Sequence, residues 1–169
     1  ITDYEVIVLD DGSTDGTRER LQERVPSWRL VFHEQNLGTY GSLNRGLELA
    51  TGEFVAIFND DDVWEPRKLE AQLELFENFT RVGIVHTNGI FIGSKGEQLA
   101  GTPLGFDYPE TETGSLVLRL LRSNAMIASS VMVRKKCFDE LGMFDPAYFG
   151  SGDWDMWLRI AEKGEGGYC

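Results

Sequence analysis

Cysteine is nearly absent from the sequence, and long apolar runs are absent altogether. The two cysteines, Cys137 and Cys169, stand in a chain of 169 residues and form neither a CxxC metal pair nor a disulfide framework. We therefore expect two reduced thiols, as in intracellular proteins. No stretch approaches the roughly 18 consecutive apolar residues of a membrane-spanning helix. The first residues, 1–12, also lack the basic start and apolar run of a signal peptide, so we expect a cytoplasmic protein.

Basic residues are scarce as well. The 16 Lys and Arg residues stand against 28 Asp and Glu residues, which gives a formal net charge of −12. Because nucleic-acid affinity comes mostly from Lys and Arg on phosphates, this charge argues against a nucleic-acid partner. A phosphate-bearing ligand would need another source of positive charge, and a divalent metal is the obvious candidate. The sequence also contains no GK[ST] of a Walker loop and no GxGxxG after the first expected strand.

The overall composition is that of an ordinary globular domain. Hydrophobic residues make up 41% and charged residues 26%, and the length is close to that of one domain. Short β-branched apolar runs predict strands at 4–9, 28–33, 53–58, 82–86, 89–93 and 126–133. Helical periodicity predicts helices at 17–25, 43–50, 66–76, 116–121 and 153–163, with 36–41 as a loop. This alternation predicts a single α/β domain over residues 1–169, with a mainly parallel central sheet flanked by helices.

Aspartates gather where two of the expected strands end. Asp10 and Asp11 follow the first strand, and the strand at 53–58 runs into Asp60, Asp61 and then a third aspartate. Ligands of open parallel sheets bind beyond the carboxyl ends of the strands. A single Asp there often caps a turn, but two clusters at one edge repel each other unless a cation lies between them. Their oxygens suit Mg²⁺ or Mn²⁺.

Four blocks of sequence now point to a known family. They are YEVIVLDDGSTDGT, then NLG followed by LNRGLELATGEFVAIFNDDDVWEPRKLE, then SSVMVRKK with LGMFD, and finally GDWDMWLRIA. In this order and spacing the chain resembles a family 2 glycosyltransferase with the GT-A fold, from Tyr4 to about Lys163. The resemblance implies transfer of a sugar from a nucleotide-diphosphate sugar, most often a UDP-sugar, with inversion and with a divalent metal (Mn²⁺ or Mg²⁺). It also implies a saccharide or lipid-linked acceptor, and a role in cell envelope polysaccharide synthesis at the inner membrane face.

The resemblance also assigns roles to the aspartates. Asp11 matches the family residue that contacts the base of the nucleotide, and Asp10 would support the nucleotide or its loop. Asp60 and Asp61 match the acidic pair of the DXD motif, with Asp60 facing the ribose and Asp61 binding the metal. A second register pairs Asn59 with Asp61, and Asp61 is the metal ligand in both.

The block at 152–161 contains the candidate catalytic base. By itself Asp153 could simply cap the following helix, but the resemblance makes it the base that removes a proton from the acceptor hydroxyl. Asp155 lies two residues on, on nearly the opposite helix face, and can pair with Arg159 at i+4. We expect Asp155 to be structural. Many relatives have Glu where Gly152 stands here.

The remaining chemistry-bearing side chains have ordinary structural interpretations. His33 and His86 have no second ligand at metal spacing, so both are expected to be structural. Tyr148, Phe149 and Trp154 could line an acceptor site, although packing into the core is the default expectation.

Relatives begin with one more strand, beside 4–9, and continue beyond Cys169. We therefore expect strand 4–9 to expose an unpaired edge, filled by a second copy of the chain in a homo-oligomer, or left open in a compromised fragment. Two other function classes stay open. A nucleotidyltransferase would usually carry a glycine-rich loop with Arg and Lys after its first strand, and none is present. A module that binds nucleotide-sugar without transferring it would have the same motifs.

Overall fold

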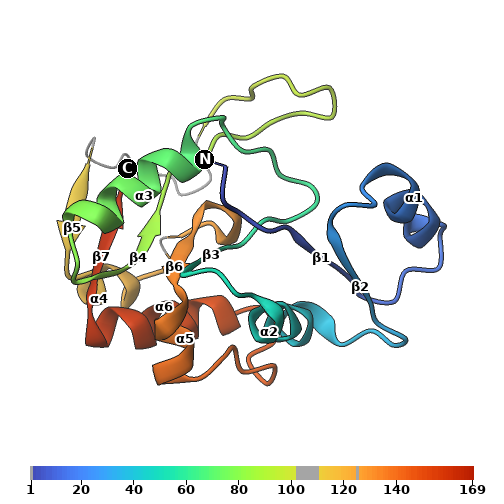
Figure 1. The fold of residues 1–169 in the computed structure, drawn as a ribbon. Coiled ribbons are helices and arrows are strands. Elements are labelled where there is room, and N and C mark those ends of the chain that lie inside the picture. The colour runs from blue at the N-terminus through green and yellow to red at the C-terminus, as the bar shows by residue number, and fades with distance from the viewer. Residues whose placement is uncertain (1, 102–110, 125) are drawn as a thin grey trace.

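The computed structural model describes residues 2–101, 111–124 and 126–169 as an α/β fold (Figure 1). The strands are β1 (Ile7–Asp10), β2 (Arg29–Phe32), β3 (Phe54–Ala56), β4 (Val82–His86), β5 (Glu112–Gly114), β6 (Met132–Arg134) and β7 (Glu165–Tyr168). The helices are α1 (Thr17–Arg24), α2 (Gly38–Leu49), α3 (Lys68–Asn78), α4 (Val117–Leu120), α5 (Lys135–Leu141) and α6 (Gly152–Lys163), with a 3-10 turn at Ala128–Ser130. Among these helices, each is too short or too polar to cross a membrane.

The central sheet has five strands in the order β3-β6-β4-β7-β5. β6 is antiparallel to both β3 and β4, β7 is parallel to β4, and β5 is antiparallel to β7. The α/β class with helices flanking a sheet is therefore confirmed. The sheet is mixed rather than mainly parallel, because β6 and β5 run against the other three strands.

Helix α3 covers one face of this sheet. Leu75 and Phe76 of α3 pack with Val82, Val85 and Met132 in one buried cluster. All five residues of β4 are buried, which explains why its apolar residues occupy both faces of the strand rather than alternating with polar ones.

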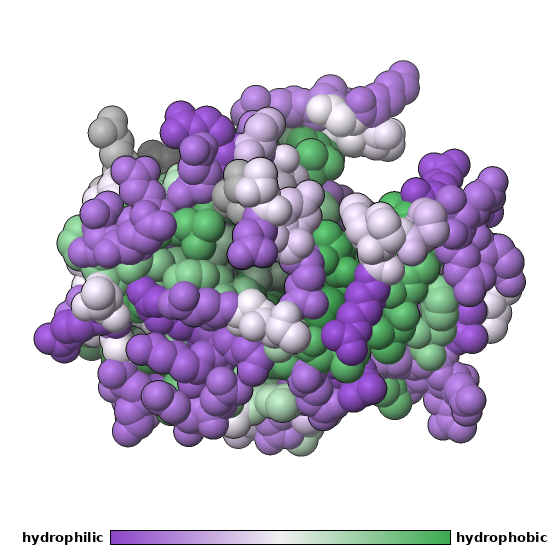
Figure 2. Space-filling view, viewed as in Figure 1, coloured by the Kyte–Doolittle hydropathy of each residue, from purple (hydrophilic) through white to green (hydrophobic). Residues whose placement is uncertain are grey.

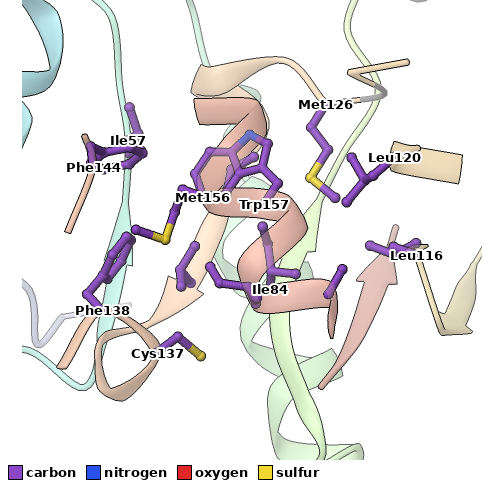
Figure 3. Close-up of a cluster of buried hydrophobic side chains, with 14 of the residues drawn as sticks. Ile57, Ile84, Leu116, Leu120, Met126, Cys137, Phe138, Phe144, Met156 and Trp157 are labelled. Atoms are coloured by element: carbon purple, nitrogen blue, oxygen red, sulfur yellow. The ribbon is translucent and has the colours of Figure 1, made fainter. Parts of the chain in front are cut away.

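Helices α4, α5 and α6 lie on the opposite face, so the sheet is the middle of three layers (Figure 1). Trp157 and Met156 of α6 are fully buried against Ile84 of β4, with Phe138 of α5 beside them (Figure 3). Burying a side chain of this size contributes about 1.5–3 kcal/mol. This packing fixes α6, and with it the position of Asp153, against the sheet.

Strands β1 and β2 form a separate parallel two-stranded sheet. The strand expected at 4–9 begins only at Ile7, Tyr4 is 67% exposed, and the apolar residues of β1 are half-buried rather than buried. The reason is that β1 has one strand neighbour, β2, among the described residues and is packed on one face by α2. A band of hydrophobic surface is visible where β1 and β2 run (Figure 2).

Two further predictions of local structure were wrong. The segment 89–93 forms no strand and contributes only an isolated bridge between Ile92 and Gln98. Most of 126–133 is not strand either, since a 3-10 turn precedes β6. Both segments are apolar but make few ladder contacts. Apolar character alone does not distinguish a strand from the exposed loop at Ile90–Ile92 or from the buried turn before β6.

Candidate active site

Asp10 ends β1 and holds the loop that follows it. It is 5% exposed, accepts a hydrogen bond from the amide of Ser13 (3.3 Å) and forms an ion pair with Arg18 (3.0 Å). Burial by itself would raise the pKa of this carboxyl, but the hydrogen bonds from Ser13 and Arg18 outweigh it and lower the pKa. Asp10 was expected to support either the nucleotide or its loop, and these contacts are with the loop.

Asp11 lies next to the N-terminus of helix α2. Its carboxylate accepts hydrogen bonds from the amides of Leu37 (2.7 Å) and Gly38 (2.9 Å), and it lies 3.3 Å from Nδ1 of His33. Burial would raise the pKa of Asp11, whereas these donors lower it and keep the group ionised. The loop predicted at 36–41 is wrong in its second half, because Asp11 satisfies the first amides of a helix that begins at Gly38.

A hollow of about 330 Å³ adjoins Asp11. Its walls are His33, Glu34, Gln35, Leu37 and Arg45. Two of these residues, His33 and Leu37, also contact the Asp11 carboxylate. The hollow includes neither Asp61 nor Asp153.

Asp60 and Asp61 occupy a turn that follows β3. The amide of Asp62 donates to the carbonyl of Asn59 (3.3 Å) and closes the turn. The amide of Asn59 donates to Oγ of Ser129 (2.9 Å), which ties the turn to the 3-10 segment. Asp60 and Asp61 are both exposed. Within the described ranges, no side chain or amide forms a hydrogen bond or ion pair with either carboxylate.

These two carboxylates fit a magnesium or manganese ion by their chemistry. Across the described part of the chain, no group of three or more His, Cys, Asp and Glu residues is arranged to hold a metal. Magnesium usually takes only one or two protein carboxylates and completes its shell with water and substrate phosphates. Two adjacent exposed carboxylates with no hydrogen-bond or ion-pair partner among the described residues meet that requirement.

Asp153 is the second residue of α6, and its carboxylate is held by three donors. Oδ1 accepts hydrogen bonds from the hydroxyl of Tyr40 (3.3 Å) and from the amide of Trp154 (2.7 Å). Oδ2 accepts one from Nδ2 of Asn124 (3.1 Å). The expected pair of Asp155 with Arg159 on the same helix is confirmed (2.9 Å).

Helix α2 brings Asp11 and Asp153 to one part of the molecule. Asp11 contacts Leu37 and Gly38, and Asp153 contacts Tyr40. A helix rises about 1.5 Å per residue, so these contacts fall within one turn.

The turn that carries Asp61 makes no direct hydrogen bond or ion pair with Asp11 or Asp153 among the described residues and is linked to Asp153 through a short stretch of chain. Ser129 holds Asn59, and Asn124 holds Asp153. Asn124 and Ser129 are five positions apart, and five residues span at most about 18 Å. Asp11 and Asp153 therefore both contact the start of α2. The turn that carries Asp61 is linked to Asp153 only through the chain between Asn124 and Ser129.

Sequence reasoning missed Tyr40 and Asn124. Both lie in segments that carry no chemical motif, and their contacts with Asp153 span 113 and 29 positions. The large aromatic side chain in the glycine-containing segment NLGTYG was the one available signal for Tyr40.

The expected packing into the fold holds for the two histidines and for Trp154, but not for the aromatic residues of the turn before α6. His33 and His86 are buried, at 8% and 0% exposure, as expected for structural residues. Trp154 packs against the core and donates its indole N–H to the carbonyl of Leu120 (2.7 Å). The default of core packing is wrong for Tyr148 and Phe149, which are 49% and 97% exposed, because both stand in the turn before α6.

Comparison with known proteins identifies similar chains. The model of the family "Glycosyl transferase family 2" matches residues 1–142. The amylovoran biosynthesis glycosyltransferase AmsB of Erwinia amylovora is 31% identical, over 95% of this chain and 55% of its own length. The chain spans less than two thirds of the length of the first curated relatives that it matches.

Two solved structures share the fold. A mannosyltransferase from Pyrobaculum calidifontis, in complex with GDP-Man and Mn²⁺, matches 95% of this chain and 43% of its own with a TM-score of 0.65 at 23% identity. TarS 1–349 of S. aureus matches 99% of this chain and 49% of its own with a TM-score of 0.74 at 19% identity. These similarities establish the GT-A-type fold.

Proposed function

The chain belongs to glycosyl transferase family 2, and from this membership we propose that it transfers a sugar from a nucleotide-diphosphate sugar to an acceptor hydroxyl. The observation that carries the proposal is that residues at the start of α2 contact both aspartates: the amides of Leu37 and Gly38 donate to Asp11, and the hydroxyl of Tyr40 donates to Asp153. These two residues stand far apart in the sequence, and the family resemblance assigned one to the donor and the other to the base. Two carboxylates that only capped helices would not need to contact the same helix.

In the proposed reaction, Asp153 removes the proton from the acceptor hydroxyl while that oxygen attacks the anomeric carbon. A bond forms between the acceptor oxygen and the carbon, and the bond from the carbon to the diphosphate oxygen breaks. The diphosphate leaves with the bonding electron pair from the face opposite to the attack, so the configuration of the carbon inverts. A positioned base of this kind typically contributes 10²–10⁴-fold to the rate.

The donor would lie along the edge that carries the aspartates. Asp11, with the hollow beside it, would contact the nucleotide base, and Asp60 would face the ribose. Asp61 would hold the divalent metal. When bound, such an ion supplies positive charge to the leaving diphosphate, which a chain of net charge −12 otherwise lacks.

The relatives suggest what the donor and acceptor are. The Pyrobaculum enzyme binds GDP-Man with Mn²⁺, whereas the sequence resemblance favours a UDP-sugar. AmsB acts in amylovoran biosynthesis. We propose a saccharide or lipid-linked acceptor in cell envelope polysaccharide synthesis, at the cytoplasmic face of the membrane.

Replacing the base tests the function. We expect Asp153→Asn to reduce sugar transfer by at least about 100-fold, because the amide cannot accept the proton. The measurement is transfer from a panel of radiolabelled UDP- and GDP-sugars in the presence of Mn²⁺. Asp155→Asn is the matched control, since it makes the same change on the same helix and removes only the ion pair with Arg159. Full activity of Asp153→Asn contradicts the assignment of the base, and the absence of transfer by the wild-type protein contradicts the proposed function.

The same assay separates the two alternatives. Calorimetry with UDP and Mn²⁺ that detects binding, without any turnover of the sugar-nucleotides, favours a module that only binds. Formation of a sugar-nucleotide from a nucleoside triphosphate and a sugar phosphate favours a nucleotidyltransferase.

A further inference from the structure

Tyr40 is placed by packing that does not depend on Asp153. Its ring stacks on the ring of Phe144, with centroids 5.7 Å apart and planes at 19°. Phe144 is buried and meets Trp157 edge-on at 5.8 Å (Figure 3). The main chain of Phe144 is bonded on both sides by Asn44, whose amide group donates to the Phe144 carbonyl (2.8 Å) and whose Oδ1 accepts from the Phe144 amide (3.0 Å). The ring of Tyr40 is therefore fixed before its hydroxyl meets any partner.

Tyr40 and Asn44 act from one face of α2. They are four residues apart, so their side chains lie one turn above the other on the helix surface. Through Asn44 and Tyr40, this face of α2 contacts the segment that runs from Phe144 to the start of α6.

Gly152 leaves the space that Tyr40 occupies. A Cβ built at Gly152 would lie 2.7 Å from Cε2 and 2.9 Å from Cδ2 of the Tyr40 ring. Real Cβ atoms essentially never approach a ring so closely, so a side chain at 152 and the ring of Tyr40 exclude each other. The glycine allows the ring to reach the residue next to it, which is Asp153.

The three hydrogen-bond donors around Asp153 are distributed unequally over its two carboxylate oxygens. A carboxylate offers about four lone-pair positions, two on each oxygen. Oδ1 accepts from Tyr40 and from the amide of Trp154, whereas Oδ2 accepts only from Asn124 among the described residues. One position on Oδ2 is therefore left for a further hydrogen bond.

All three donors are neutral groups. They orient the carboxylate without cancelling its negative charge, which a base must retain. Burial raises the pKa of the Tyr40 phenol, with a smaller contribution from the charge of Asp153. The phenol therefore remains protonated at neutral pH and acts as a donor.

We propose that Tyr40, together with Asn124, is a positioning residue for Asp153 and directs Oδ2 toward the acceptor. This inference rests on the proposed function. The proton of the acceptor hydroxyl passes to Oδ2 of Asp153 as the acceptor oxygen bonds to the anomeric carbon and the diphosphate leaves with its electron pair. Tyr40 keeps its own proton throughout.

Tyr40→Phe tests the proposal because it removes the hydroxyl and keeps the ring on Phe144. We expect kcat to fall about 10-fold with the KM for the donor unchanged, as for other groups that orient a reacting residue. Tyr4→Phe removes a hydroxyl from an exposed tyrosine and is the matched control. The melting temperature is measured on each variant.

The outcomes separate this inference from the proposed function. A Tyr40→Phe protein with wild-type kcat overturns the inference, even if its melting temperature falls, provided that Asp153→Asn is inactive. If Asp153→Asn retains full transfer activity, the assignment of Asp153 as the base fails and the positioning role fails with it, whereas a wild-type protein without any transfer activity overturns the proposed function itself. A fall in kcat for Tyr40→Phe, with Tyr4→Phe unchanged, supports the inference.

Discussion

At the scale of single residues, the metal assignment depends on Asp61. Its carboxylate is exposed and has no protein partner within the described ranges, so it is available to a cation. We expect Mn²⁺ to tighten the binding of UDP or GDP to the wild-type protein. In Asp61→Asn this gain should fall about 10-fold or more, because the amide oxygen carries no charge to offset the ion. Titration calorimetry with and without Mn²⁺, and after EDTA treatment, measures the effect.

The neighbouring Asp62 provides the matched control for this test. Asp62 accepts a long hydrogen bond from Asn59 (3.5 Å) within the turn and has no assigned role at the metal. Asp62→Asn should therefore keep most of the response to Mn²⁺. If Asp61→Asn responds to the metal as the wild type does, the metal ligand has been misassigned.

The sequence points to candidate residues that lie in recognisable motifs, but not to the residues that hydrogen-bond to them. Asp11, Asp61 and Asp153 could be named as candidate site residues because carboxylates follow strands or begin a helix within characteristic blocks. Tyr40 and Asn124 could not, because their role depends on contacts across the fold. A tyrosine near a helix start has no local feature that identifies Asp153 as its partner.

At the scale of elements, the predictions depended on how local the stabilising contacts are. Helices α1 and α6 were predicted closely, since their apolar spacing and end signals lie within the segment itself. The start of α2 was missed because a carboxylate 27 positions away, in Asp11, accepts the amide of Gly38. The edge strand β5 and its neighbour β7 were missed because each is stabilised by pairing, in a glycine-containing sequence with little strand propensity.

The junction of α2 with α6 makes a testable prediction at this scale. In an ordinary first turn Gly→Ala is favourable, but at Gly152 the new methyl group would overlap the Tyr40 ring. We expect Gly152→Ala to destabilise the protein by about 2 kcal/mol, as for other overpacked sites, which lowers the melting temperature by roughly 6 °C. Tyr40→Ser removes the ring, so Gly152→Ala should cost almost nothing in that background. Equal losses in both backgrounds would show that the ring is not the obstacle.

At the scale of the whole molecule, the two sheets each leave an edge open. Among the described strands, β1 pairs only with β2, and β3 pairs only with β6. Unpaired edges with apolar side chains recruit further strands. The surface band over β1 and β2 in Figure 2 supplies the apolar part of such an interface. These features favour the predicted homo-oligomer in which a second copy completes the sheet.

The backbone of β1 shows how to test this association. The carbonyls of Val6 and Asp10 accept hydrogen bonds from β2, both at 2.9 Å. Because backbone groups alternate along a strand, the amides of even-numbered residues face β2, and that of Ile7 faces the open edge. Ile7→Pro therefore removes a donor from the open edge and leaves the pairing with β2 intact, whereas Val8→Pro removes a donor from the pairing itself.

We expect the wild-type protein to associate in a concentration-dependent manner in sedimentation velocity experiments. Ile7→Pro should shift it toward the monomer with little change in melting temperature, since only the outer edge is altered. Val8→Pro should instead lower the melting temperature by several degrees, because it breaks a hydrogen bond within the β1–β2 sheet. A wild-type protein that stays monomeric across the concentration range, or an Ile7→Pro protein that associates equally well, would place any self-association away from this edge.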